Sequence, residues 1–224
     1  RSLMYTTEKN KVLVLNRRDF VDLTSGSSAN TLKYEINDKS RTARITKNAV
    51  YIKNGVLLSN PSKRDFKNVV AGEIKLISTD GNSDYNVVII RSFNNMLVGS
   101  KDAFKYNVFS KNTNQSVNLD PELKTVVIKD ENGNLIDFSD IKPDDVLTTI
   151  EGAGYAEVYV SRKTVSGQVS SKETDKWIIS DGEYYLSADK KTALVSGNIS
   201  YQIKAYLNYQ GEIVFAENLS LDGT

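Results

Sequence analysis

The chain contains no histidine and no cysteine among its 224 residues. Histidine is the side chain that titrates closest to neutral pH, and cysteine is the strongest nucleophile and a ligand for soft metals. Their absence excludes Ser-His-Asp and Cys-His catalysis, zinc and haem sites built on these ligands, and disulfide bonds. Carboxylate chemistry and ions bound by oxygen ligands, such as Ca²⁺, remain open.

Long apolar runs and an excess of one charge are also missing. The longest apolar runs, residues 87–90 and 55–58, are much shorter than a membrane span. The 29 basic and 28 acidic side chains leave a net charge of +1, which gives no electrostatic footprint for nucleic acid or an anionic membrane. No nucleotide-binding or serine-hydrolase motif occurs. We therefore expect neither nucleic acid as a partner nor membrane insertion.

The lack of cysteine also bears on the compartment. Bacterial and viral proteins built for the outside of the cell often avoid thiols, whereas eukaryotic secreted domains collect disulfides. We expect an exported or particle-borne protein rather than a cytosolic one. The first residue is Arg1 and not Met, so we interpret the chain as a piece of a longer polypeptide.

The pattern along the chain predicts an all-β protein. Short, alternating, β-branched segments recur between turn residues, as in sandwiches and barrels. Asn54-Gly55 and residues 132–133 place Asn-Gly between apolar runs, which is a hairpin signal because a type I′ turn needs two positive φ angles. Residues 86–93 hold four apolar residues in a row, which favours a central strand. Residues 19–28 are polar and predict a loop.

We predict two or three small β subdomains in series, with boundaries near residues 115 and 155. Residues 1–115 would form an N-terminal β domain with Asn/Asp-rich hairpins. Residues 116–155 would form a connecting β-hairpin subdomain, and residues 156–224 a small barrel of SH3-like or OB-like type. Short meandering strands close readily into such a barrel, and closure removes exposed strand edges.

Asp80, Asn82 and Asp84 alternate along one predicted loop. Oxygen ligands at positions i, i+2 and i+4 are how a Ca²⁺ loop begins. The glycine and glutamate that an EF-hand requires later in the loop are replaced by Tyr85 and Arg91, and the arginine would repel a cation. The alternative is an Asx-rich turn held by its own side-chain-to-backbone hydrogen bonds. Calcium at these three residues is one hypothesis, and no other cofactor is expected.

Aromatic residues crowd the last third of the chain, and four of them are candidates for a carbohydrate-binding face: Tyr184, Tyr185, Trp177 and Tyr206. Aromatic residues on strands more often fill a core or pair across strands. Tyr184 and Tyr185 are adjacent, so one is expected to be buried and the other exposed. Exposed aromatic side chains mark an interaction surface only where they cluster.

Three acidic residues, Asp140, Asp144 and Asp145, are the candidates for acid–base catalysis. Glycosidases need two carboxyl groups held across an enclosed sugar site, and these residues instead resemble the cap of a short helix before a strand. We therefore expect a protein that is not an enzyme. The basic groupings of the first 44 residues are interleaved with acids, and we interpret them as solvated faces: Lys9, Lys11, Arg17, Arg18, Lys39, Arg41 and Arg44.

Residues 72–90 resemble the segment G-x-x-x-L-I-D-x-D-G-D-G-x-Y-D-V-V-x-V, which occurs in β-rich domains of large Firmicutes surface proteins, often ones with S-layer homology repeats. Other pieces follow in the same order as in that family. Residues 49–55 are similar to its A-x-V-x-Y-N-G hairpin and residues 142–147 to its D-V-L turn. Residues 158–169 and 181–185 resemble its V-x-V-S-x-K-x-V-x-G-x-V segment and its D-G-K-x-Y hairpin.

This resemblance covers most of the chain and implies a structural, envelope-exposed β protein without known catalysis. Ser78 and Asn86 stand where the family usually has Asp, which weakens a metal site there. We expect an extracellular location in a cell-surface layer, with a phage virion as the alternative. The expected partners are other structural subunits, including copies of this chain, and cell-wall glycan is the alternative partner.

Overall fold

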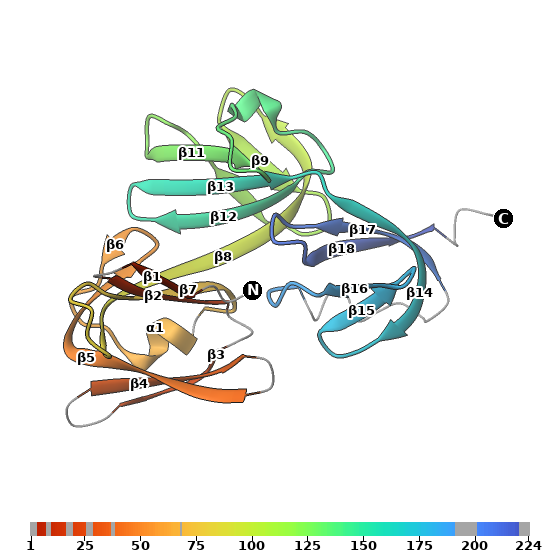
Figure 1. Ribbon diagram of the computed structural model, residues 1–224. Helices are drawn as coiled ribbons and strands as arrows, with labels where there is room; N and C mark the ends of the chain where they lie inside the picture. The colour runs from red at the N-terminus through yellow and green to blue at the C-terminus, as the bar shows by residue number, and fades with distance from the viewer. Residues whose placement is uncertain are drawn as a thin grey trace. The chain divides into compact units, whose positions relative to one another are not determined.

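The computed structural model describes residues 4–7, 10–16, 20–25, 29–36, 39–67, 69–190 and 201–219. These residues are almost entirely β-strand, with little helix, and their strands form two sheets (Figure 1). The expected all-β class is therefore confirmed. The chain divides into two compact units, Arg1–Phe93 (unit 1) and Asn94–Thr224 (unit 2). Both predicted boundaries, at 115 and 155, lie within unit 2.

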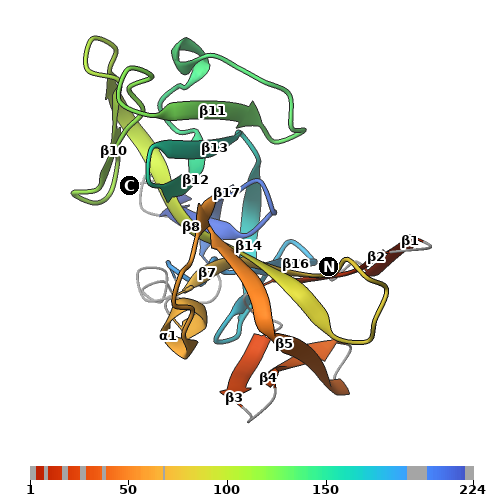
Figure 2. The ribbon, with the colours of Figure 1, turned by 90° about the vertical axis from the view of Figure 1, so that its left-hand side faces the viewer.

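Unit 1 is built from paired strands in the order β1–β2–β7–β8–β5–β4–β3, with β6 also paired to β5. The pairs are antiparallel except β5–β8, which is parallel. Figure 2 shows β3, β4 and β5 side by side. Their bounds are β1 (Met4–Thr7), β2 (Asn10–Asn16), β3 (Phe20–Ser25), β4 (Ala29–Ile36), β5 (Lys39–Lys53), β6 (Val56–Leu57), α1 (Lys63–Lys67), β7 (Ala71–Ser78) and β8 (Tyr85–Asp102).

The core of unit 1 is formed by apolar side chains that alternate along its strands. On β7, Ile74 and Leu76 are fully buried, and they stand opposite Leu15 and Leu13 of β2 in the antiparallel register. Because side chains on a strand alternate between faces, these four residues gather on one face. Helix α1 adds Phe66 to the same cluster. The predicted loop at residues 19–28 is wrong, since it contains β3, which pairs with β4.

Two turns follow their local sequence. Asn54 and Gly55 have φ angles of 48° and 79°, so the chain turns there as an Asn-Gly hairpin between β5 and β6. The second Asn-Gly, at residues 132–133, is not followed by a paired hairpin strand. After it the chain makes only an isolated bridge, between Lys129 and Leu135, because β11 pairs instead with β13, in parallel.

Unit 2 contains the end of β8 and two groups of strands. In the first group, the strand order is β8–β12–β13–β11. The C-terminal part of β8 also pairs with β9, and β9 pairs with β10. Figure 1 shows β11, β13 and β12 side by side. The bounds are β9 (Asn107–Ser110), β10 (Ser116–Asn118), β11 (Thr125–Asp130), the 3-10 turn η2 (Phe138–Asp140), β12 (Val146–Gly152) and β13 (Tyr155–Ser161).

The last strands form a five-stranded sheet in the order β16–β15–β14–β17–β18, and this sheet is open. The expected closed barrel is therefore not formed by the described residues, where a single bridge, Leu186 to Ile213, links the chain after β16 to β18. One bridge does not replace a ladder of hydrogen bonds. The bounds are β14 (Thr164–Lys172), β15 (Lys176–Ile179), β16 (Gly182–Tyr185), β17 (Gln202–Leu207) and β18 (Ile213–Asn218).

The two strand groups of unit 2 share an apolar and a polar contact. The apolar contact is a buried cluster of Leu97, Val146, Tyr206 and Val214. The polar contact centres on the fully buried Asn95 of β8.

The side-chain amide of Asn95 donates to Ser187 Oγ at 3.0 Å and to Asp189 Oδ1 at 3.1 Å, and its oxygen accepts from Thr148 Oγ1 at 2.6 Å. A buried amide whose donors and acceptor are all used fixes the position of the groups around it. Asn95 therefore ties β8 to β12 and to the segment after β16.

Candidate functional site

The predicted calcium residues lie in the loop between β7 and β8. Asp80 Oδ1 accepts from Ser78 Oγ at 2.9 Å and from the Asn82 backbone N–H at 3.1 Å. Its Oδ2 accepts from Asn82 Nδ2 at 2.6 Å. These bonds, led by the Asn82 backbone N–H, hold the pKa of the Asp80 carboxyl below its ordinary value. The carboxylate oxygens thus serve as acceptors for the loop's own donors.

The third predicted ligand is directed to a different partner. Asp84 Oδ2 lies 3.3 Å from Arg44 Nε on β5, and its Oδ1 accepts from Ser83 Oγ at 3.3 Å. Among the described residues, no three acidic side chains form a group able to hold a metal ion. The structure therefore brings Asp80 and Asn82 together as an Asx turn and pairs Asp84 with an arginine, and calcium binding stays a prediction.

Two of the four residues of the predicted aromatic face are buried. Trp177 and Tyr206 are buried, and each ring packs in a hydrophobic cluster of unit 2. The Tyr206 hydroxyl donates to Glu217 Oε2 at 3.0 Å. Tyr184 is partly buried against the same cluster as Trp177, and Tyr185 is exposed, as the alternation on β16 predicted. These residues fill a core and leave a single exposed ring, because sheet faces with large aromatics bury them where a core is available.

The three acidic residues weighed for catalysis each have a structural partner. Asp140 Oδ2 accepts from the Asp137 backbone N–H at 3.0 Å, and Asp144 Oδ1 lies 2.7 Å from Lys111 Nζ. Asp145 is buried at the start of β12, where it faces Arg162 at 3.2 Å and accepts from the Lys142 backbone N–H at 2.9 Å.

Burial raises the pKa of the Asp145 carboxyl, although the Lys142 N–H and the Arg162 guanidinium act in the opposite direction. A carboxyl with a raised pKa is a feature that acid–base sites share with buried structural groups. Here the carboxylate serves as an anchor between the turn that precedes β12 and the end of β13.

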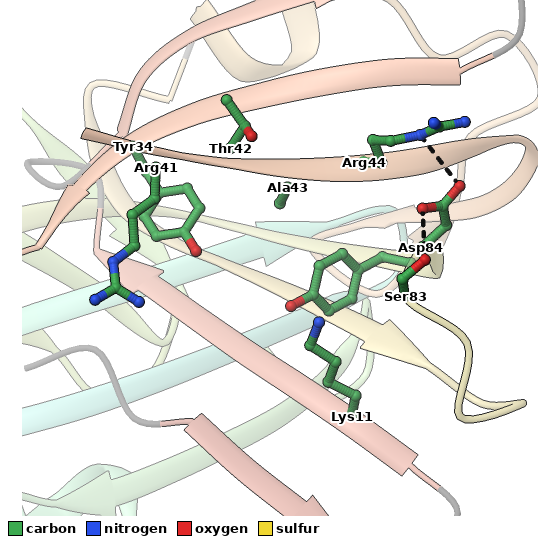
Figure 3. Close-up of a pocket in the computed structure, with 9 residues that line it drawn as sticks. Lys11, Tyr34, Arg41, Thr42, Ala43, Arg44, Ser83 and Asp84 are labelled. Atoms are coloured by element: carbon green, nitrogen blue, oxygen red, sulfur yellow. Dashed lines mark hydrogen bonds and ion pairs between the residues drawn. The ribbon is translucent and has the colours of Figure 1, made fainter. Parts of the chain in front are cut away.

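Unit 1 carries an open cleft with a cavity volume of about 630 Å³. Residues from β2, β4, β5, the β7–β8 loop and β8 line it (Figure 3): Lys11, Tyr34, Arg41, Thr42, Ala43, Arg44, Ser83, Asp84 and Tyr85. This volume lies within the range of small-molecule sites. Three of these side chains are cationic and one is anionic, so the cleft is a positively charged site in a chain whose overall charge is nearly balanced.

Unit 2 carries a smaller, mainly apolar cavity of about 240 Å³. Its walls include Tyr106 and Phe138, whose rings meet edge to face at 5.3 Å between centroids. The remaining lining residues are Leu119, Pro121, Val126, Ile128, Ile136 and Asp137.

Three large apolar side chains near the lining residues in the sequence are exposed to solvent. Phe104, Leu123 and Leu135 are 98%, 71% and 75% exposed, and each lies within two residues of a residue that lines the cavity. We call these three residues the apolar rim. Exposed apolar side chains are typical of protein-contact surfaces where they cluster.

The fold and these sites define an all-β protein with one cationic cleft and one apolar surface feature. The chain matches no established protein-family profile and no curated protein sequence. Within the described ranges, no helix has the length and hydropathy needed to span a membrane. The resemblance to Firmicutes surface proteins therefore stays a prediction drawn from motifs.

Sequence reasoning missed the members of the cleft as a group. Lys11, Arg41 and Arg44 were expected on solvated faces, Tyr85 was considered only as a departure from the calcium-loop pattern, and Tyr34 was not a candidate. The cleft assembles strands far apart in the sequence, so no local spacing links Lys11 to Tyr85. The available signal was the aromatic and basic content of residues 34–44, which pair as a β4–β5 hairpin with Tyr34 opposite Arg41.

Proposed function

We propose that this chain is a structural, non-catalytic module of an extracellular bacterial assembly, such as a surface layer, and that it works through protein–protein contacts. A phage particle is the alternative setting. The observation that carries the proposal is the apolar rim beside the cavity of unit 2, Phe104, Leu123 and Leu135. Large apolar side chains that stay exposed mark an interaction surface where they cluster, and these three lie close in sequence to residues of one cavity.

The partners of the acidic residues support the non-catalytic part of the proposal. Asp140, Asp144 and Asp145 hold a turn and two strands in place, as described above. The loops add rigidity, because Asx turns close them: Asp130 accepts from the backbone N–H of Asn132 and of Asn134, both at 2.9 Å. Rigid loops and continuous strands suit a module that maintains spacing in an assembly.

The alternative function is a carbohydrate-binding module, for which four aromatic residues of the last third were the predicted binding face. Trp177 and Tyr206 are buried, so they offer no ring face to a sugar. The observation in its favour is the cationic cleft of unit 1.

The assembly proposal is tested by the self-association of this chain. Sedimentation velocity over a wide concentration range should show reversible oligomers of the wild type. Phe104→Ser with Leu135→Ser should weaken their formation by about tenfold or more in dissociation constant, because exposed apolar anchors carry much of an interface's energy.

Leu57→Ser is the matched control, since Leu57 is a large exposed side chain on unit 1. It should associate like the wild type. A wild type that stays monomeric at the highest concentration reached, or a double variant that associates as well as the wild type, contradicts the proposal.

A further inference from the structure

The cleft of unit 1 contains two buried tyrosines whose hydroxyl groups have no hydrogen-bond partner among the described residues. Tyr34 and Tyr85 are only 6% and 3% exposed, and both line the cleft. Within the described part of the chain, neither hydroxyl makes a hydrogen bond. Every fully buried side-chain oxygen or nitrogen of the described residues has a hydrogen-bond partner. Because the two tyrosine hydroxyls have no such partner there, their oxygens are not fully buried and open into the solvent of the cleft. Such hydroxyls bond to water or to a ligand.

These hydroxyls stay protonated at neutral pH. Burial raises the pKa of Tyr85 to about 12, and the neighbouring Tyr34 adds to this rise. Burial also raises the pKa of Tyr34, with Arg41 acting in the opposite direction. Each hydroxyl therefore both donates and accepts, as a sugar hydroxyl does.

Two cations of the cleft have no acidic partner among the described residues. Arg44 is paired with Asp84 at one end, as Figure 3 shows. Arg41 lies at the other end beside Tyr34, opposite it in the β4–β5 register. Lys11 lies with its Nζ 5.1 Å from the centroid of the Tyr85 ring. Neither Arg41 nor Lys11 forms an ion pair with any described residue.

The volume of the cleft indicates how large an anionic ligand it can hold. A lone phosphate or carboxylate would occupy a small part of about 630 Å³. The rest of the lining offers neutral hydrogen-bonding groups, among them the two tyrosine hydroxyls and Thr42, together with the apolar surfaces of the tyrosine rings and Ala43. The matching ligand is therefore anionic at one point and rich in hydroxyl groups elsewhere. Arginine suits the anionic point because its planar fork pairs with both oxygens of a carboxylate or phosphate.

We propose that the cleft formed by Lys11, Tyr34, Arg41 and Tyr85 binds an acidic saccharide, a sugar chain that carries carboxylate or phosphate groups. The anionic group lies between Arg41 and Lys11, and sugar hydroxyls bond to the tyrosine hydroxyls. This site is on unit 1, apart from the apolar rim on which the assembly proposal depends. Binding and self-association are measured separately, so either proposal can fail without the other.

The test is calorimetric titration of the chain with trigalacturonic acid, with a short glycerol-phosphate oligomer, and with neutral maltotriose. One of the two acidic probes should bind saturably and at least about tenfold more tightly than maltotriose, with an affinity that falls as salt is added. The tighter probe distinguishes a carboxylate from a phosphate ligand. Inorganic phosphate and acetate should bind more weakly than the acidic saccharides.

Variants place the binding in the cleft. Arg41→Gln and Lys11→Gln should each weaken binding by about tenfold, because each removes a charged hydrogen-bond donor. Tyr34→Phe should weaken it several-fold and leave the melting temperature unchanged, since its hydroxyl has no hydrogen-bond partner in the described part of the chain. Lys47→Gln is the matched control, an exposed cation on β5 outside the cleft, and it should bind like the wild type.

Three results overturn the proposal. The first is that neither acidic saccharide binds better than maltotriose, and the second is that inorganic phosphate or acetate binds as tightly as the saccharides. The third is that folded Arg41→Gln and Lys11→Gln variants bind as well as the wild type.

Discussion

The buried amide of Asn95 gives the sharpest prediction about stability. Asn95→Ala removes three side-chain hydrogen bonds: to Ser187, to Asp189 and from Thr148. Neutral buried hydrogen bonds contribute about 1 kcal/mol each, and bonds to a carboxylate about 2 kcal/mol. The expected loss is therefore about 4 kcal/mol of the free energy of unfolding, a large part of the stability of a domain of this size.

The neighbouring residue offers a matched control. Asn94 is exposed, and the bond at its position uses the backbone oxygen, which accepts from Thr149 Oγ1 at 3.3 Å. Asn94→Ala should therefore change the free energy of unfolding by less than about 0.5 kcal/mol.

Urea unfolding measures both variants through the fluorescence of Trp177. This is the chain's single tryptophan, and it is buried in unit 2, the unit that contains Asn95. The midpoint of Asn95→Ala should shift strongly to lower urea, and the slope should stay that of the wild type. If the two alanine variants differ by less than about 1 kcal/mol, the polar contact does not join the strand groups as described.

Two further predictions concern backbone space and pH. Gly72 has a φ of +147°, and an added Cβ would lie 2.0 Å from the backbone oxygen of Arg91. Gly72→Ala should therefore lower the free energy of unfolding by about 3 kcal/mol or more, measured by thermal unfolding followed by circular dichroism. Gly133 has a φ of +88° and open space around it, so Gly133→Ala should lower the free energy of unfolding only by the smaller cost of the backbone strain. Burial raises the pKa of Asp145 above its ordinary value of 3.8, so the folded state keeps this proton at a pH where the unfolded chain has lost it. The contribution of this group to stability is thus fully present below pH 3.8 and is lost as the pH rises through the raised pKa, above which both states are ionised. Asp145→Asn should remove this fall in a series of urea unfolding curves across the acidic range, and an unchanged pH profile would refute the assignment.

Local features of the fold were predictable from the sequence. Residues 86–93, whose apolar run favoured a central strand, lie in β8, which pairs with β5 and β7. The turn at Asn54-Gly55 adopts the positive φ angles that its residue types favour. These features depend on backbone preferences and on the side chains of adjacent residues, which the sequence displays directly.

Pairing was less predictable, because it depends on residues far apart in the chain. Residues 39–53 form the single 15-residue strand β5. Strand β5 pairs in parallel with β8, and β11 pairs in parallel with β13. Neither parallel pair leaves a signal like that of a hairpin turn, since parallel strands need long connections.

By itself, the amino-acid sequence determined the all-β class, several turns and the absence of histidine and cysteine chemistry. Only the tertiary structure decided that Trp177 and Tyr206 are buried, that Asp84 pairs with Arg44, and that Lys11 meets Tyr85 in one cleft. Alternation states that a strand has two faces, but the neighbours that cover each face come from distant parts of the chain. Burial, ion pairing and clefts are properties of those long-range contacts.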